Sequence, residues 1–314
     1  MRAHAIVVVA ALFAALGSSA ACRHQPDPLP KPPPPPLEYL GEWGAKGDGP
    51  GQLSRPVSLA TDALGNVYVA DPGSGFVHKF DPQGHPLLSF KDERLGKPAG
   101  IAVDRGGAIY VTDPRRGSVF IFLPDGERFR EIRARPGQRR WAPVGVTVDD
   151  EGSLFVVARV SNQIEKFSPR GRLLKAWALQ RDVPDQIVFP AAATVGPDGF
   201  LYVVDRQAGQ VQKFTREGEF ISRWGEAHAG FPADGTDEVS SGIAVSEKYV
   251  FLADAAHRGV RVWTLDGQQK LADDLGGRLR SEVSRSFVVA FSPRGELLVL
   301  DSAGPRVLRF RINF

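Results

Sequence analysis

Short runs of apolar residues, separated by glycine, proline and aspartate, extend along residues 37–314. The runs are typical of β-strands joined by tight turns, and no long amphipathic helix pattern competes with them. One phrase recurs, as GNVYVADPGSGFVHKFDPQG at 65–84, GAIYVTDPRRGSVFIFLPDG at 107–126 and GFLYVVDRQAGQVQKFTREG at 199–218. The pattern predicts an all-β chain built from repeated units.

Six copies of the phrase align on the residue that ends its first apolar run. These anchor positions lie 42 to 49 residues apart, the spacing of propeller blades, and they are Asp71, Asp113, Ala158, Asp205, Asp254 and Asp301. Nine residues after each anchor stands a large aromatic residue, expected to pack between neighbouring sheets: Phe80, Phe122, Phe167, Phe214, Trp263 and Phe310. The anchor aspartates are expected to accept backbone N–H groups of the following turn.

The sixth copy ends at Phe314 after only three strands, which would leave an open sheet edge. The segment EYLGEWG at 38–44 is similar to EFISRWG at 219–225, the predicted fourth strand of the fourth copy. The N-terminal segment is therefore predicted to supply the missing strand. The expected fold is an all-β, six-bladed β-propeller of four-stranded antiparallel blades, with the last blade closed by the N-terminal strand.

The stretch PAGIAVDRGGAIYVTD at 98–113 resembles the repeat of the NHL β-propellers, and the resemblance extends over residues 37–314. It implies the six-bladed fold but is a poor guide to activity. The arginine that NHL repeats place before the valine of the third strand is present only as Arg306. A common role for that arginine is therefore not expected in the other copies.

The first 21 residues have the pattern of a secretory signal peptide, with a basic start, a short apolar run and small residues before Cys22. This predicts export. Two processing routes remain open: lipidation of Cys22, which the resemblance to bacterial lipoprotein signals favours, or plain cleavage after Ala20 or Ala21.

Residues 22–36 are rich in proline and are predicted to form a semi-rigid tether between Cys22 and the propeller at 37–314. A lipid on Cys22 would hold the protein on a membrane. The expected location is that of an outer membrane lipoprotein facing the periplasm or the cell surface. The alternative is a soluble periplasmic or secreted protein.

The composition excludes some kinds of functional site but does not indicate a particular one. With 39 Lys and Arg residues against 36 Asp and Glu residues, the formal net charge is +3, which permits an anionic partner without requiring one. A single cysteine excludes an internal disulfide and a cysteine-based zinc site. Although some NHL propellers bind RNA, export argues against a nucleic-acid partner.

Some NHL relatives are amidating lyases in which several histidines hold zinc, a site that needs three converging imidazoles. Only His228 and His257 are expected on the rim that faces a ligand. A cation site of acidic residues would have to use Asp234, Asp237 and Glu238 in the loop that leads into the fifth blade. No nucleophile elbow, phosphate loop or His-Glu-x-x-His motif is present, so we expect no catalytic residue, metal or cofactor.

A basic rim is the strongest functional candidate. The segment RARPGQRRWAP at 133–143 has four arginines and no acid, and arginine beside an aromatic residue is a typical anchor for an anionic ligand. Trp141 is either such an anchor or a residue that packs beneath the loop. The candidate ligand-binding residues are Arg94, Arg135, Arg139, Arg140, Trp141, Arg285 and Arg306.

The sequence therefore favours a monomeric binding or scaffolding module in the cell envelope, with a protein or anionic glycan as its partner. The alternative is a metal-dependent lyase or hydrolase at the mouth of the channel, similar to amidating lyases or lactonase propellers. His228 and His257 would be its first candidate residues.

Overall fold

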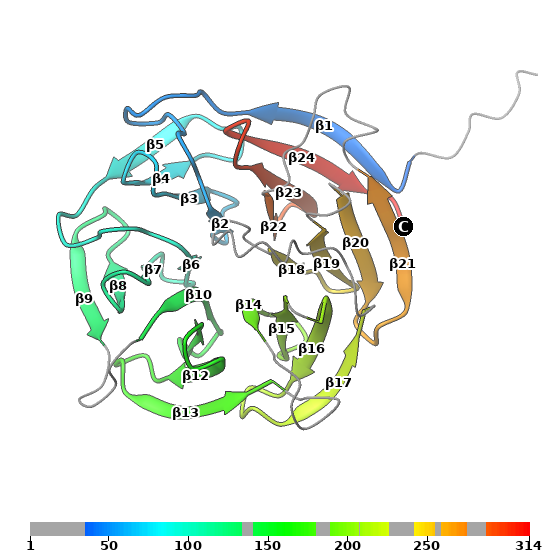
Figure 1. Ribbon diagram of the computed structural model, residues 1–314. Helices are drawn as coiled ribbons and strands as arrows, with labels where there is room; N and C mark the ends of the chain where they lie inside the picture. The colour runs from blue at the N-terminus through cyan, green and yellow to red at the C-terminus, as the bar shows by residue number, and fades with distance from the viewer. Residues whose placement is uncertain are drawn as a thin grey trace, which may run out of the picture. The chain divides into compact units, whose positions relative to one another are not determined.

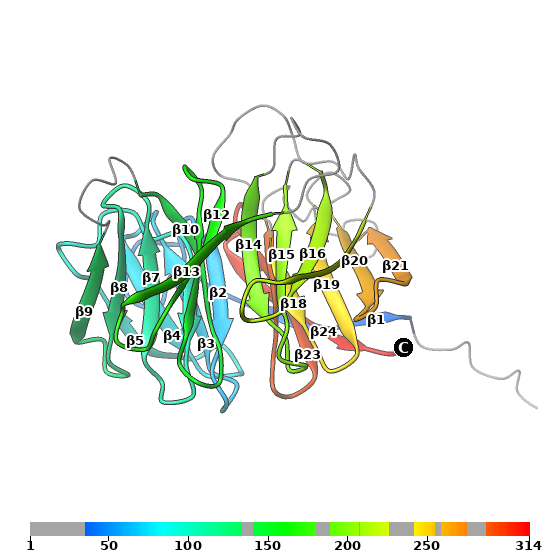
Figure 2. The same cartoon turned by 90° about the horizontal axis from the view of Figure 1, so that it is seen from below.

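The computed structural model describes residues 35–133, 141–179, 189–206, 208–225, 242–254, 259–274 and 287–314. The regular structure of these residues is entirely β, with six four-stranded antiparallel sheets arranged as blades around one axis (Figure 1 and Figure 2). The predicted six-bladed β-propeller is confirmed. Within the same ranges, no helix has the length and apolar character needed to cross a membrane.

The first three blades each run outward from the axis in chain order. Blade 1 contains β2 (Ser58–Thr61), β3 (Val67–Asp71), β4 (Phe76–Phe80) and β5 (Pro86–Phe90). Blade 2 contains β6 (Ile101–Val103), β7 (Ile109–Asp113), β8 (Ser118–Phe122) and β9 (Arg128–Arg133). Blade 3 contains β10 (Pro143–Val148), β11 (Leu154–Ala158), β12 (Gln163–Phe167) and β13 (Leu173–Ala178).

The remaining blades complete the ring. Blade 4 contains β14 (Pro190–Val195), β15 (Leu201–Asp205), β16 (Gln210–Phe214) and β17 (Phe220–Trp224). Blade 5 contains β18 (Ile243–Val245), β19 (Tyr249–Asp254), β20 (Gly259–Thr264) and β21 (Gln269–Asp274). Blade 6 contains β22 (Phe287–Phe291), β23 (Glu296–Asp301), β24 (Arg306–Ile312) and, as its outermost strand, β1 (Leu37–Trp43).

The second strand of each blade forms the centre of the core. Every residue of β3, β7, β11 and β15 is buried, because a neighbouring blade covers each face of the sheet. Strands buried on both faces read as continuous apolar runs rather than as alternating ones. The six aromatic residues placed nine positions after the anchors are also buried, none more than 4% exposed, as their spacing predicted.

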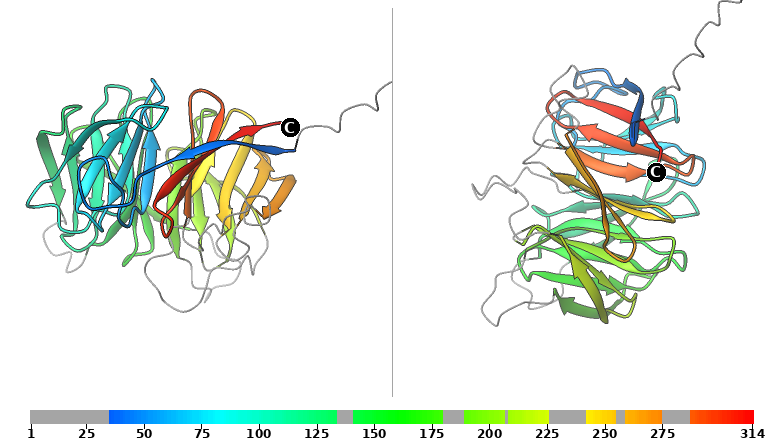
Figure 3. Two further views of the ribbon diagram at one scale, coloured as in Figure 1. Left: turned by 90° about the horizontal axis from the view of Figure 1, so that it is seen from above. Right: turned by 90° about the vertical axis from the view of Figure 1, so that its right-hand side faces the viewer.

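The N-terminal strand closes the ring, also as predicted. β1 pairs antiparallel with β24 from Leu37 opposite Ile312 to Trp43 opposite Val307, so strands from the two ends of the described chain lie side by side (Figure 3). Leu37 is 2% exposed and belongs to the core between blades 5 and 6. The backbone N–H of Asn313 donates to the carbonyl of Pro36 at 2.9 Å, which fixes the two ends together.

Neighbouring blades are joined at their outer edges by a repeated contact. The outer strand of one blade ends in a large apolar side chain that lies on a turn glycine of the next blade. The pairs are Trp43 with Gly84, Phe90 with Gly126, Ile132 with Gly171, Trp177 with Gly218 and Trp224 with Gly267. All five glycines have positive φ, so both the backbone conformation and the packed side chain require a residue without a Cβ.

We expect Gly218→Ala to lower the free energy of unfolding more than Gly295→Ala does. Both glycines have nearly the same φ, +81° and +80°, but a Cβ at Gly218 would lie 2.6 Å from the Trp177 ring whereas nothing lies within 4 Å at Gly295. The control substitution should cost about 1–2 kcal/mol from backbone strain. Gly218→Ala should cost about 1–3 kcal/mol more from overpacking, measured by urea unfolding. Equal losses would show that the inter-blade contact contributes nothing.

Candidate functional site

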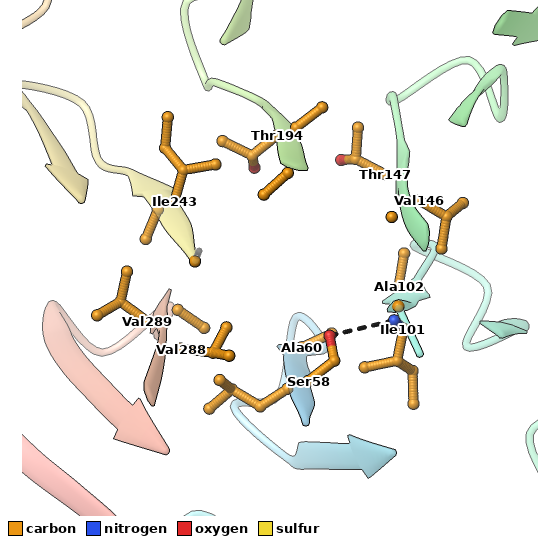
Figure 4. Close-up of a pocket in the computed structure, with 18 of the residues that line it drawn as sticks. Ser58, Ala60, Ile101, Ala102, Val146, Thr147, Thr194, Ile243, Val288 and Val289 are labelled. Atoms are coloured by element: carbon orange, nitrogen blue, oxygen red, sulfur yellow. Dashed lines mark hydrogen bonds between the residues drawn. The ribbon is translucent and has the colours of Figure 1, made fainter. Parts of the chain in front are cut away.

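The central channel is narrow and chemically plain. It encloses a cavity of about 330 Å³ lined by β2, β6, β10, β14, β18 and β22, mostly by valine, alanine and isoleucine (Figure 4). None of its lining residues is charged.

The hydroxyl groups in the channel connect neighbouring blades. Ser58 accepts the Ile101 N–H at 3.3 Å, Thr61 donates to the Phe291 carbonyl at 3.0 Å, and Thr147 accepts the Val195 N–H at 3.3 Å. These bonds join blade 1 to blades 2 and 6, and blade 3 to blade 4. The lining therefore offers a narrow, uncharged passage and contains no acid, base or charged nucleophile.

The anchor aspartates organise the rim at which the inner strands begin. Asp71 is fully buried, and its carboxylate accepts the Gly73 N–H at 2.9 Å, as expected for the turn after the second strand. It also accepts the Ser54 N–H at 2.6 Å and the Arg55 N–H at 3.0 Å. The sequence did not predict this second set of bonds, because Ser54 and Arg55 lie in the loop that enters the blade.

The same arrangement in blade 2 brings basic side chains together. Asp113 accepts the N–H groups of Gly96 at 2.6 Å and Lys97 at 2.9 Å on one carboxylate oxygen. Its other oxygen accepts those of Arg115 at 2.9 Å and Arg116 at 3.0 Å. One buried carboxylate thus holds two loops, and each of the two presents basic residues to solvent.

We call Arg94, Lys97, Arg115 and Arg116 the blade 2 rim patch. All four residues are exposed, and Glu93 is the exposed acid on the same loop. The nearby Glu131 is already paired with Arg133 at 2.8 Å. The hydrogen bond from Arg133 is the main influence that lowers the pKa of Glu131, burial opposes it, and the charge of Arg94 adds to the lowering. The patch therefore keeps a positive excess.

The other predicted ligand-binding residues have different outcomes. Trp141 is 4% exposed and packs on Phe167 with ring centroids 5.8 Å apart, which agrees with packing beneath the loop and corrects its use as an exposed anchor. Arg306 pairs with Glu42 at 3.2 Å and Asp301 at 3.4 Å, and so links β1 to blade 6. Four of the predicted residues lie outside the described part of the chain: Arg135, Arg139, Arg140 and Arg285.

The residues that the sequence offered for lipidation, catalysis or metal binding also lie outside the described ranges. These are Cys22, His228, His257, Asp234, Asp237 and Glu238. Within the part of the chain that the structure describes, no three His, Cys, Asp or Glu side chains are close enough to hold a metal ion.

The aspartates on the opposite rim stabilise turns. Asp62 accepts the N–H groups of Leu64 at 3.0 Å and Asn66 at 2.9 Å, and the Tyr68 hydroxyl donates to its other oxygen at 3.1 Å. Burial is the main reason that the pKa of Tyr68 is raised, and the negative charge of Asp62 adds to the effect. Asp62 is therefore part of the turn between β2 and β3.

His78 is a buried titratable residue whose environment the sequence did not reveal. It lies on β4, is fully buried, and its Nδ1 is 2.8 Å from Ser89 Oγ, while Nε2 has no hydrogen-bond partner among the described residues. Burial lowers its pKa to about 4; the negative charge of Asp71 opposes this and the charge of Lys91 adds to it. Its place in the alternating pattern of the strand is the same as that of an apolar core residue, so no feature of the sequence indicated a buried histidine with a lowered pKa.

We expect His78 to make the propeller acid-sensitive. Its pKa is about 4 in the folded protein and about 6.5 for an unperturbed histidine, so the unfolded chain binds the proton more readily between these pH values. Stability from this group is therefore lost as pH falls from about 6.5 to about 4, by about 3 kcal/mol in all. Urea unfolding of His78→Leu should show a shallower loss over this range, since Leu308 occupies the matching position in blade 6.

An identical pH slope in His78→Leu and the unchanged protein would contradict the prediction.

Comparisons with known proteins agree with this fold. Residues 95–122, which include most of the blade 2 rim patch, match the NHL repeat family model. The chain is thus a six-bladed β-propeller with an NHL repeat. A search of curated proteins found no significant match.

Three solved structures share the architecture at low sequence identity. A streptogramin B lyase is 14% identical, with a TM-score of 0.60 over 88% of this chain and 98% of its own. A virginiamycin B lyase from Staphylococcus aureus with quinupristin is 14% identical, with a TM-score of 0.58 over 87% and 88%. The hydrazine synthase of Kuenenia stuttgartiensis is 14% identical, with a TM-score of 0.55 over 87% and 99%. At these identities the similarity shows the fold alone.

Proposed function

We propose that this propeller is a binding scaffold that holds an anionic partner, a protein loop or a glycan, on the blade 2 rim patch. The main support is the bonding of Asp113, which fixes the backbone of two basic loops with four hydrogen bonds of 2.6 to 3.0 Å. Exposed charges on a rigid frame lose little backbone freedom on binding, which favours recognition. The channel, by contrast, supplies no charged group.

The setting that we propose is the cell envelope. The signal-like segment before Cys22 supports export, and lipidation of Cys22 would attach the proline-rich tether to a membrane. β1 begins at Leu37, directly after this tether. The propeller would then be held at a distance from the membrane that the tether sets, with its rim available to envelope proteins or glycans.

Reversing two charges in the patch should weaken anion binding. We expect the variant with Arg115→Glu and Arg116→Glu to bind immobilised poly-L-glutamate about tenfold more weakly at low salt, because two attractive contacts become repulsive. The matched control is Arg170→Glu with Arg172→Glu, two exposed arginines in the β12–β13 turn on the opposite rim. It makes the same change in net charge. Equal weakening in both variants would indicate a non-specific charge effect and would remove the patch from the proposal.

A metal-dependent lyase or hydrolase is the second candidate function. It is supported by the shared fold of the streptogramin B and virginiamycin B lyases, which is a similarity of architecture only. His228 and His257 would be the residues to test. Elemental analysis of the purified protein separates the two proposals, since stoichiometric zinc that is lost in a variant with His228→Ala and His257→Ala would favour the enzyme. A metal-free, stable propeller would favour the scaffold.

A further inference from the structure

Blade 3 keeps the anchor turn but lacks the anchor carboxylate. Ala158 occupies the position of Asp71 and Asp113, and it pairs with the residue five positions later, as they do. The turn keeps a positive φ four positions after the anchor, with Asn162 at +52° where blades 1 and 2 have glycines at +76° and +62°. Its closing bond differs, because the Asn162 N–H donates to the carbonyl of Arg159 at 3.3 Å, whereas the Gly75 N–H in blade 1 donates to the carbonyl of Asp71 at 2.8 Å. Asn162 is the only non-glycine residue with positive φ among those described.

In blades 1 and 2, the anchor carboxylate accepts hydrogen bonds from backbone N–H groups at the same four positions relative to the anchor. In blade 2 these are the N–H groups 17 and 16 residues before the anchor and two and three residues after it. Blade 1 repeats the pattern with Ser54, Arg55, Gly73 and Ser74 at 2.6 to 3.3 Å. Two loops therefore converge on one carboxylate, with donors directed at both of its oxygens.

The corresponding donors in blade 3 belong to Trp141, Ala142, Val160 and Ser161. Their N–H groups have no acceptor among the described residues, although Ala142 accepts the Arg159 N–H at 3.0 Å through its carbonyl. Trp141 and Ala142 are only 4% and 8% exposed. Val160 is 55% exposed and Ser161 is also exposed, so the buried donors without an acceptor are those of Trp141 and Ala142. Buried N–H groups without an acceptor are rare and costly in proteins, and backbone donors that converge form an anion-binding nest.

We propose that this nest binds the carboxylate of a ligand, which takes the place of the missing anchor side chain. The contacts follow from blade 2: one oxygen would accept from Trp141 and Ala142, and the other from Val160 and Ser161. Because four N–H dipoles converge there, the nest favours an anion over a cation. Because the matching donors in blades 1 and 2 hold a carboxylate, the nest favours that planar group over a phosphate.

The nest adjoins the blade 2 rim patch. A Cβ at Gly117, the residue after Arg116, would lie 2.8 Å from the carbonyl oxygen of Trp141, so the turn that bears Arg115 and Arg116 touches the entrance to blade 3. The inference rests on the proposed function for the source of the carboxylate, which would be an acidic side chain of the bound partner. The patch then attracts the partner by charge and the nest fixes one of its carboxylates.

The first experiment titrates ¹⁵N-labelled protein with acetate at constant ionic strength and follows the amide signals of Trp141, Ala142, Val160 and Ser161 by NMR. We expect saturable shifts in the millimolar range. In Ala158→Asp these shifts should disappear, because the new side chain fills the nest, and the melting temperature should rise by about 2–4 °C. Absence of saturable shifts in the unchanged protein would overturn the proposal. Stronger binding of inorganic phosphate than of acetate would overturn the choice of a carboxylate.

The reciprocal variant tests the same geometry without depending on blade 3. Asp113→Ala should create a second nest in blade 2, so acetate should raise its melting temperature more than that of the unchanged protein. A stable variant that acetate leaves unaffected would contradict the inference. Failure here is distinguishable from failure of the proposed function, because loss of acetate binding and loss of poly-L-glutamate binding in the variant with Arg115→Glu and Arg116→Glu are measured separately.

Discussion

The pairing of β1 with β24 is the contact on which the whole structure depends. The second strand of each blade is apolar on both faces, so each blade needs a neighbour on either side. A row of six blades satisfies this only when it closes into a ring. The last blade obtains its fourth strand from the other end of the propeller sequence, and backbone pairing, buried Leu37 and the ion pair between Arg306 and Glu42 hold it there. β1 covers the edge that β24 would otherwise expose, so blade 6 has four strands like its neighbours.

A second recurring interaction, between a buried anchor carboxylate and two loops, serves both the fold and the proposed site. In blades 1 and 2 it satisfies backbone N–H groups that would otherwise be buried without partners. In blade 2 the same bonds set the spacing of exposed arginines and lysine. In blade 3 the replacement by Ala158 preserves the turn and removes the acceptor. The recognition surface that we propose therefore uses the same two loops that the anchor carboxylate organises in blade 2, together with the loops of blade 3 where that carboxylate is missing.

The division of chemistry between channel and rim follows from geometry. Inner strands converge on the axis, so they accept small side chains, and their hydroxyl groups are used in bonds between blades. Charged residues lie on loops and on the second to fourth strands, where water or hydrogen-bond partners stabilise their charge, as the loop N–H groups do for the buried Asp71 and Asp113. A scaffold that binds at its rim is consistent with this division, and the low identity to lyases of the same fold leaves their activity as a separate proposal.

Local sequence patterns determined the architecture: the strand count, the buried aromatic residues, the turn glycines and the closing segment could all be predicted, because propeller blades repeat and each anchor position constrains its neighbours. The site was predicted only in part. Arg94 stays a prediction as a binding residue, Trp141 is buried, and Arg306 is paired across the ring closure with Glu42, 264 positions away in the sequence. Other features arise where segments distant in sequence meet. They are the hydrogen bonds from the loops that enter blades 1 and 2 to the anchor carboxylates, the burial of His78, and the proposed nest at Ala158. Burial and convergence of backbone donors are properties of three-dimensional packing, so only the tertiary structure decided them.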